Sequence, residues 1–239
     1  MATRPEGRTA FAGRADIAQI DVGLRQYMLR VYNYMAGGLA LTGLLAYFTA
    51  SSPAMLQLIF GSPLRYVVIF APFALVLFMG FRIHKMSLGA AQLTYWAYAA
   101  LNGLAFASIF LVYTHTSIAR VFFITAGTFA AMSLYGYTTR RDLTGFGNFL
   151  MMGLIGIVIA ALVNIFLASS ALAFAISVIG VIVFVGLTAY DTQKIKEWYV
   201  AADDGATMGK KAVYGALTLY LDFINLFLLL LRLFGNSRN

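Results

Sequence analysis

The chain has 239 residues, of which 61% are hydrophobic and 11% are charged, and its formal net charge is +8 at pH 7. Soluble globular proteins contain about 45–50% apolar and about 25% charged residues, so this composition indicates an integral membrane protein. Because the chain contains no cysteine, disulfides, zinc–thiolate sites and a thiol nucleophile are excluded.

Apolar segments recur along nearly the whole chain. A helix that crosses a membrane needs about 20 mostly apolar residues, and the sequence predicts an all-α integral membrane protein with seven transmembrane helices. We expect residues 1–33 to form a short N-terminal arm, residues 34–235 the transmembrane domain and residues 236–239 a tail. The predicted spans are Tyr34–Ala50, Tyr66–Phe81, Gly89–Tyr113, Ile118–Tyr137, Phe146–Ala168, Ala171–Tyr190 and Ala212–Phe234.

The N-terminal arm is polar and of mixed charge. It contains five arginines together with Glu6, Asp16 and Asp21. Mitochondrial presequences are rich in arginine but poor in acidic residues, so the three acids argue against one. We expect a cytoplasmic arm that ends in an interfacial turn around Gln26–Val31, after which the first span acts as an uncleaved insertion signal.

The basic residues are unevenly divided between the two sides of the membrane. With seven spans and a cytoplasmic N-terminus, 13 basic residues lie inside and 4 outside, which agrees with the positive-inside rule. The positive charge is therefore a topology signal. A nucleic-acid partner is disfavoured, because no basic stripe with interleaved aromatic residues is present. The inside residues are Arg4, Arg8, Arg14, Arg25, Arg30, Arg82, Lys85, Arg140, Arg141, Lys194, Lys196, Lys210 and Lys211, and the outside residues are Arg65, Arg120, Arg232 and Arg238.

The last predicted span carries a polar stripe. Tyr214, Thr218, Asp222 and Asn225 are spaced by four, four and three residues, which places them on one helix face. Asp222 lies roughly 15 Å into this span, near the middle of the bilayer, where a carboxylate costs roughly 2.5–3.5 kcal/mol. Such a stripe should face the bundle interior or a water-filled path. For Thr218 and Asn225 the alternative is a purely structural role in interhelical hydrogen bonds.

A second aspartate and an arginine share one membrane level. Asp191 closes the sixth span near its cytoplasmic end, and Arg82 follows the second span on the same side. An ion pair between them is therefore geometrically possible. The alternative is that Arg82 is an ordinary cytoplasmic anchor that snorkels to the interface. His84 and His115 are expected in loops on opposite sides of the membrane, which makes a joint metal site implausible.

Three motifs, in order, resemble one known family. VYNYMAGGLALTG (Val31–Gly43), AYDTQKIK (Ala189–Lys196) and LYLDFINLFLLLLRLFG (Leu219–Gly235) are similar to the opening segment, the "YDTQ" element and the C-terminal segment of the Bax-inhibitor, or transmembrane Bax inhibitor motif, family. The resemblance covers about residues 25–235, and the short polar arm resembles that of a bacterial member. The expected location is the inner (plasma) membrane of a bacterium, with the N-terminus cytoplasmic and the C-terminus outside.

The resemblance implies a fold and a function. The family implies seven helices with the last one central, and a pH-sensitive leak of calcium ions across the membrane. Its paired aspartates correspond to Asp191 and Asp222, implied to act as the pH sensor, and its gate arginine best matches Arg82. Bacterial relatives are also implied to bind and modulate a membrane-bound ATP-dependent protease. No cofactor is expected, and calcium would be the permeant ion.

Elementary chemistry agrees with that implication. Two carboxylates in one low-dielectric site cannot easily both ionise, so they are expected to share a proton. An arginine brought to Asp191 would favour its charged form and occlude the path, and protonation would change which partners hold together. Calcium takes oxygen ligands, so Asp191 and Asp222, with Thr218 and Asn225 lining the path, could form a weak transit site for calcium.

Three other classes of protein are considered. An intramembrane aspartyl protease also places two aspartates on late helices, but its second aspartate lies in a Gly-x-Gly-Asp context, whereas Leu219-Tyr220-Leu221 precedes Asp222 here. A retinal protein needs a lysine in the last helix, and no lysine follows Lys211. A non-conducting regulator that binds a protease or another membrane protein stays open as the alternative function.

Overall fold

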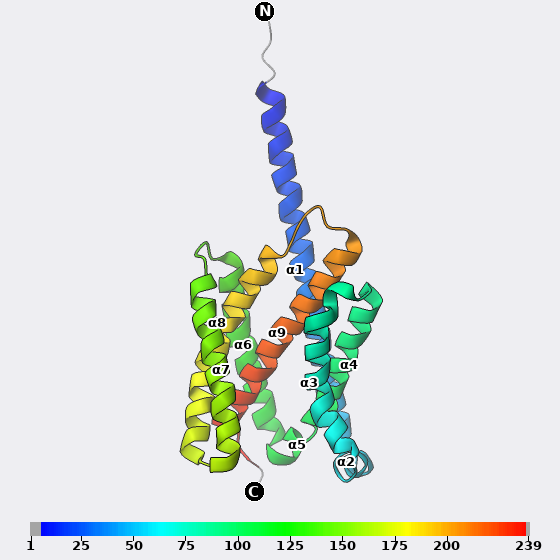
Figure 1. The fold of residues 1–239 in the computed structure, drawn as a ribbon, viewed down its shortest axis with the longest axis vertical. Coiled ribbons are helices and arrows are strands. Elements are labelled where there is room, and N and C mark those ends of the chain that lie inside the picture. Colours follow the sequence, from blue (N-terminus) through cyan, green and yellow to red (C-terminus); the bar gives the residue numbers. More distant parts are fainter. Residues whose placement is uncertain (1–5, 238–239) are drawn as a thin grey trace, which may run out of the picture.

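The computed structural model describes residues 6–237, with side chains described from Val22 onward. This part of the chain is almost entirely helical, and its elements follow one another in the order shown in Figure 1. They are α1 (Glu6–Ala50), α2 (Pro53–Phe60), α3 (Leu64–Arg82), the 3₁₀ helix η1 (Ile83–Lys85), α4 (Leu88–Phe106), α5 (Ile109–Val112), α6 (His115–Thr138), α7 (Thr144–Leu167), α8 (Ser170–Glu197) and α9 (Gly205–Phe234).

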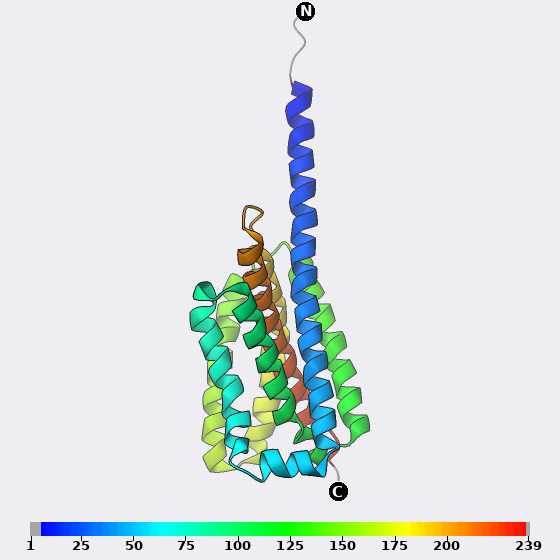
Figure 2. The same ribbon diagram turned by 90° about the vertical axis from the view of Figure 1, so that its right-hand side faces the viewer.

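The long helices cross the bundle from end to end. Among the described residues six segments are long and apolar enough to span a membrane, and α1 with α2 makes a seventh if this bent pair counts as one span. The two helices meet at 102°, so α2 lies across the base of the bundle (Figure 2). The start of α1 and the end of α9 lie at opposite ends of the molecule (Figure 1). The predicted all-α membrane architecture is confirmed.

The expected turn around Gln26–Val31 is absent, because α1 is one helix from Glu6 to Ala50. Tyr27, Met28, Val31 and Met35 are buried, and their spacing of three or four residues continues the apolar face of the first span toward the N-terminus. The helix therefore packs as part of the bundle from about Tyr27 onward. The domain boundary expected at residue 33 falls inside α1.

The C-terminal helix α9 is the centre of the bundle, as expected. It packs against α8, α1, α6 and α4, and half of its membrane-spanning window is buried. By contrast, α7 packs mainly along α8, and only Gly147 and Leu150 of this helix are buried. Helix α7 therefore lies at the periphery, where its apolar side chains are available to lipid.

A buried threonine ties α9 to two other helices. Oγ1 of Thr42 in α1 donates a hydrogen bond to the carbonyl oxygen of Ala99 in α4 and lies 2.7 Å from the hydroxyl of Tyr220 in α9. Gly103 of α4 lies against the backbone of Thr42, where an added Cβ would come within 2.8 Å of the Thr42 carbonyl oxygen. The absence of a side chain at Gly103 allows the close approach that these hydrogen bonds need.

Helices α8 and α9 extend further than their apolar cores. α8 continues to Glu197, so Asp191 lies inside the helix, six residues before its last residue. α9 begins at Gly205 and is capped by Asp204, whose Oδ1 accepts a hydrogen bond of 2.6 Å from the backbone N–H of Thr207. Both additions are polar helical turns, which a hydropathy pattern does not mark.

Candidate functional site

The carboxyl groups of Asp191 and Asp222 meet where α8 packs against α9. Each is within hydrogen-bonding reach of the other. Asp222 is only 4% exposed, and its Oδ2 receives no hydrogen bond from any donor in the described part of the chain. An ionised carboxylate is only an acceptor, so a hydrogen bond between the two groups requires a proton on one of them. The structure therefore brings the two expected acids together.

Thr192, the next residue of α8, connects to α6 and α1. Its Oγ1 donates to the carbonyl oxygen of Thr188 at 2.7 Å and lies 3.0 Å from Oγ of Ser133. Ser133 Oγ in turn lies 2.7 Å from the hydroxyl of Tyr32. This chain of hydroxyl groups fixes the rotation of α8 beside Asp191.

Gln193 and Tyr190 fix the other side of the same turn. Oε1 of Gln193 accepts the backbone N–H of Leu143, and its Nε2 donates to the carbonyl oxygen of Arg141, both at 2.8 Å. The ring of Tyr190 packs against Gly147 of α7. The turn from Tyr190 to Gln193 thus makes contact with α7, α9, α6 and the α6–α7 loop, which positions Asp191 precisely enough to meet Asp222.

The polar stripe of α9 lies along a less buried face of the helix. Oγ1 of Thr218 donates to the carbonyl oxygen of Tyr214, and Nδ2 of Asn225 donates to that of Leu221. Both donors are thus used within α9, and neither side chain bonds to another helix in the region that the structure describes. Their oxygen atoms keep lone pairs free to accept a proton donor or a cation.

A cavity of about 430 Å³ lies above this stripe, between η1 and the ends of α8 and α9. Tyr214, the first residue of the stripe, lines it together with Trp198. The rings of these two residues stack with their centroids 5.7 Å apart. Nζ of Lys211 donates to the carbonyl oxygen of Trp198 at 2.9 Å and so holds the end of α8 in place. The stacked rings thus form part of the cavity wall.

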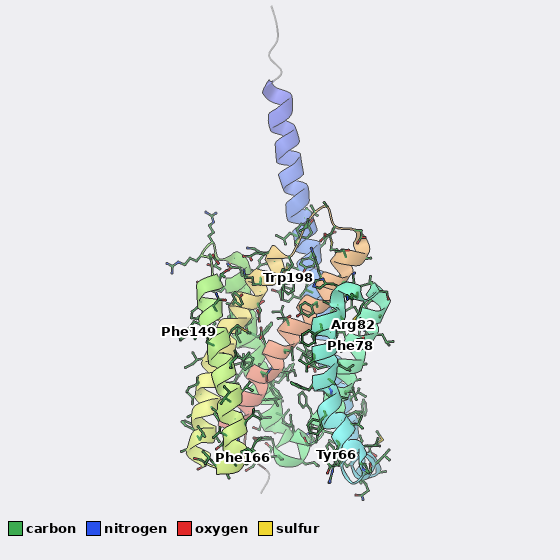
Figure 3. The ribbon with its side chains drawn as sticks, viewed as in Figure 1. Tyr66, Phe78, Arg82, Phe149, Phe166 and Trp198 are labelled. Atoms are coloured by element: carbon green, nitrogen blue, oxygen red, sulfur yellow. The ribbon has the colours of Figure 1, made fainter. Side chains whose placement is uncertain are left out.

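Arg82 does not reach Asp191 in this structure. It is exposed on α3 (Figure 3), and the only ion pairs among the described side chains are Lys194–Glu197 and Lys211–Asp203. Gly80, Ile83 and His84 line the cavity, and at about 100° per residue Arg82 lies on the opposite side of the helix from Gly80. The ion pair expected from membrane level alone is therefore absent, because level does not determine the direction in which a side chain points.

A family model described as "Inhibitor of apoptosis-promoting Bax1" matches residues 24–239. The chain belongs to the Bax inhibitor family. It is 53% identical over 225 residues to the inner membrane protein YbhL of Escherichia coli. The alignment covers 93% of this chain and 96% of YbhL. It is also 53% identical over 221 residues to the protein RP147 of Rickettsia prowazekii, and this alignment covers 92% of this chain and 93% of RP147. The resemblance inferred from the three motifs is confirmed.

This Bax inhibitor family member shows no dense metal site in the part of the chain that the structure describes. No group of three or more His, Asp or Glu side chains is placed there to hold a metal ion. His84 lines the cavity at one end, and His115 begins α6 at the other end. In the described part of the chain, Asp191 and Asp222 are the two carboxylates that lie close together between α8 and α9.

Three residues of the site were not singled out from the sequence of this family member. Trp198 follows the last residue of α8, outside the apolar core, and its stacking on Tyr214 has no signal in the sequence. Thr192 and Gln193 lie in the recognised motif beside Asp191. Their partners Ser133 and Leu143 are about 50 or more residues away, so only the fold reveals what they do.

Proposed function

We propose that this protein is a pH-sensitive calcium leak channel, with Asp191 and Asp222 as proton sensor and ion pathway and Arg82 as gate. The observation that carries the proposal is the contact of the two carboxyl groups inside the bundle. Buried acids in a membrane protein are costly and mark ion or proton pathways. Two carboxyl groups that stay in contact by sharing a proton should separate when the pH rises and the proton is lost, and each can then take another partner.

The proposed path follows α9. It enters at the cavity lined by Tyr214 and Trp198, passes Thr218 to the pair of Asp191 and Asp222, and continues along Asn225. Calcium prefers carboxylate, amide and hydroxyl oxygens, which this series supplies. Two carboxylates hold the ion weakly, as conduction requires, since an ion must also leave each site.

The proposed gate depends on the choice of partner for Asp191. When Asp191 forms a hydrogen bond with Asp222, the pair must hold a proton. When the pair is fully ionised the two carboxylates repel, and Asp191 gains by pairing with a cation. Helix α3 packs mainly against α4, and closure of the gate requires it to move so that Arg82 approaches α8. We propose that this ion pair closes the path near neutral pH and that acid releases it.

Calcium flux into liposomes that contain only the purified protein tests this proposal. Flux is measured with an entrapped calcium indicator over a range of pH, for the natural protein and for Asp222→Asn. Asparagine neither titrates nor attracts a cation, so Asp222→Asn should strongly reduce the flux or remove its pH dependence. Asp142→Asn is the matched control, because Asp142 is an exposed carboxylate of the α6–α7 loop, and it should leave the profile unchanged.

Two results would contradict the proposal. Unchanged flux with an unchanged pH profile in Asp222→Asn would show that this carboxyl group is not part of the path. Flux no greater than that of empty liposomes at any pH would leave the second candidate function.

That second candidate is a non-conducting regulator that binds and modulates a membrane-bound ATP-dependent protease. One observation favours it: α1 continues as a helix beyond the end of the bundle (Figures 1 and 2), so its backbone is presented to a partner at that end. Removal of residues 1–18 should then abolish co-purification of the protease while leaving the fold of the bundle intact. Retained co-purification would contradict a role for this extension.

A further inference from the structure

Helices α1 and α6 run next to each other on one side of the bundle (Figure 2). Both pack against α8 and α9, and a cavity of about 490 Å³ lies between them. Its walls come from only these two helices. They are Arg25, Met28, Leu29 and Tyr32 of α1 and Phe129, Ala130, Ser133, Leu134 and Tyr137 of α6.

A smaller cavity of about 90 Å³ lies further along α1, where Leu39 and Ala46 face Phe122 of α6 and side chains of α4, α5 and α9 complete the lining. The α1 residues that line the two cavities form two groups, within 25–32 and within 39–46, and at about 100° per residue both groups fall on one face of the helix. The 22 residues from Arg25 to Ala46 span about 32 Å, close to the thickness of the hydrocarbon core of a bilayer. We call this α1–α6 seam the furrow.

The chemistry of the furrow suits one kind of occupant. Its walls are largely apolar. Among its polar side chains, Tyr32 and Ser133 are bonded to each other, and Thr42 bonds to the Ala99 carbonyl and the Tyr220 hydroxyl. The charged group on its lining is Arg25, which is exposed and forms no ion pair with a carboxylate among the described side chains. Nζ of Lys196 lies 5.6 Å from the centre of the Tyr137 ring at the same end. The furrow is thus apolar along its length and positive at one end.

We infer that the furrow binds an anionic phospholipid, with an acyl chain between α1 and α6 and its phosphate beside Arg25. The apolar walls of the furrow match the acyl chain of such a lipid, and the positive end of the furrow matches its negative headgroup. A basic residue at a membrane surface attracts anionic headgroups, and an acyl chain is the apolar body available at this depth. A zwitterionic lipid would match the apolar walls but would gain less from Arg25. The inference does not depend on the proposed calcium leak.

Quenching of tryptophan fluorescence by brominated lipids tests the inference. In a background with Trp96→Phe and Trp198→Phe, Leu29→Trp puts the reporter on the furrow wall, since Leu29 is 50% exposed and lines the cavity. The protein is placed in vesicles with brominated phosphatidylglycerol or brominated phosphatidylcholine. We expect phosphatidylglycerol to quench this reporter with about fivefold higher apparent affinity, as one basic contact with a headgroup provides.

Two matched controls make the result specific. Phe149→Trp places the same reporter on the outer face of α7 (Figure 3), where Phe149 is 68% exposed, and it should show no preference. Arg25→Gln should abolish the preference at Leu29→Trp. Arg30→Gln, an equal loss of charge on the side of α1 that faces α4, should retain it.

Three outcomes would overturn the inference. They are an equal affinity for the two lipids at Leu29→Trp, the same preference at Phe149→Trp, and a preference that survives Arg25→Gln or falls equally with Arg30→Gln. The first would show that the furrow does not select an anionic lipid. The second and third would show a general attraction of this basic membrane face for anionic lipid rather than a site at Arg25.

Discussion

Gly136 of α6 packs directly against the backbone carbonyl of Ala189 in α8, so closely that a side chain at this position would overlap it. Ala189 comes two residues before Asp191. The contact therefore sets the distance between α6 and α8 close to the aspartate pair. It also allows Ser133 and Thr192 to approach within 3.0 Å of each other.

Gly136→Ala should lower the free energy of unfolding. The new methyl group needs space that the backbone of α8 occupies, and such overpacking costs about 1–3 kcal/mol. The free energy is measured from SDS-induced unfolding in mixed micelles, followed by circular dichroism. Gly127→Ala is the control on the same helix, because nothing lies within 4 Å of an added Cβ there, and the higher helix propensity of alanine should make it neutral or stabilising. Equal losses in the two variants would contradict the contact as the cause.

The spans were predictable from the sequence because hydropathy alone marks them, and the ends of α8 and α9 were not. Each helix continues in polar turns, which include Lys194 and Lys196 in α8 and the residues before Ala212 in α9. Polar residues in these turns bond to neighbouring helices. Nζ of Lys196, for example, donates to the carbonyl oxygen of Tyr137 at 2.8 Å. The expected turn at Gln26–Val31 was wrong for a related reason: a polar composition masked the helical spacing of the residues that pack.

Asp204 should make the stability of α9 depend on pH. Hydrogen bonds from the backbone and side chain of Thr207 hold the pKa of Asp204 below its ordinary value. A pKa that is lower in the folded state adds stability above the unfolded value of about 3.9, and this contribution is lost as the pH falls through the folded value. Asp204→Asn keeps a cap but does not titrate. Its melting temperature should therefore be lower than that of the natural protein at neutral pH. This difference should shrink as the pH falls below about 4. A constant difference across this range would contradict the prediction.

The orientation in the membrane is predicted from charge. Four basic residues lie at the end of the bundle from which α1 projects, which the positive-inside rule assigns to the cytoplasm. They are Arg82 at the end of α3, Lys85 in η1, and Arg140 and Arg141 in the α6–α7 loop. Because the bundle is crossed an odd number of times, a reporter fused after Asn239 should lie outside, whereas one inserted after Arg141 should lie inside. A cytoplasmic reporter after Asn239 would mean that one segment does not cross the membrane.

The candidate site was partly predictable. The spacing of Tyr214, Thr218 and Asp222 identifies one face of a helix, and a buried carboxylate demands a partner. The contact with Asp191 follows from the packing of α8 on α9, for which the sequence supplied only the family resemblance. The side of α3 on which Arg82 lies depends on helix rotation, which a shared membrane level leaves undetermined.

The gate yields the last prediction. Arg82 is exposed and forms no ion pair with Asp191 in the structure, where the carboxyl group of Asp191 lies close to that of Asp222. Asp191 cannot pair with Asp222 and Arg82 at once, since a hydrogen bond to Asp222 needs a shared proton and an ion pair with Arg82 needs an ionised carboxylate. If Arg82 holds the ionised state closed, Arg82→Ala should raise the resting calcium leak near neutral pH and weaken the response to acid. Arg82→Lys should be intermediate, because lysine keeps the charge but loses the bidentate geometry of a guanidinium.

A double-mutant cycle on calcium flux with Arg82→Ala and Asp191→Asn decides whether the two residues act together. In the closed state each substitution removes the same ion pair, so Arg82→Ala should not change the leak near neutral pH any further once Asp191 is replaced by asparagine. Arg30→Gln, an equal loss of basic charge at the same end of the bundle, should combine additively with Asp191→Asn. Additive effects of Arg82→Ala and Asp191→Asn would instead show that the residues do not form a pair, and Arg82 would then be a membrane anchor whose charge serves topology alone.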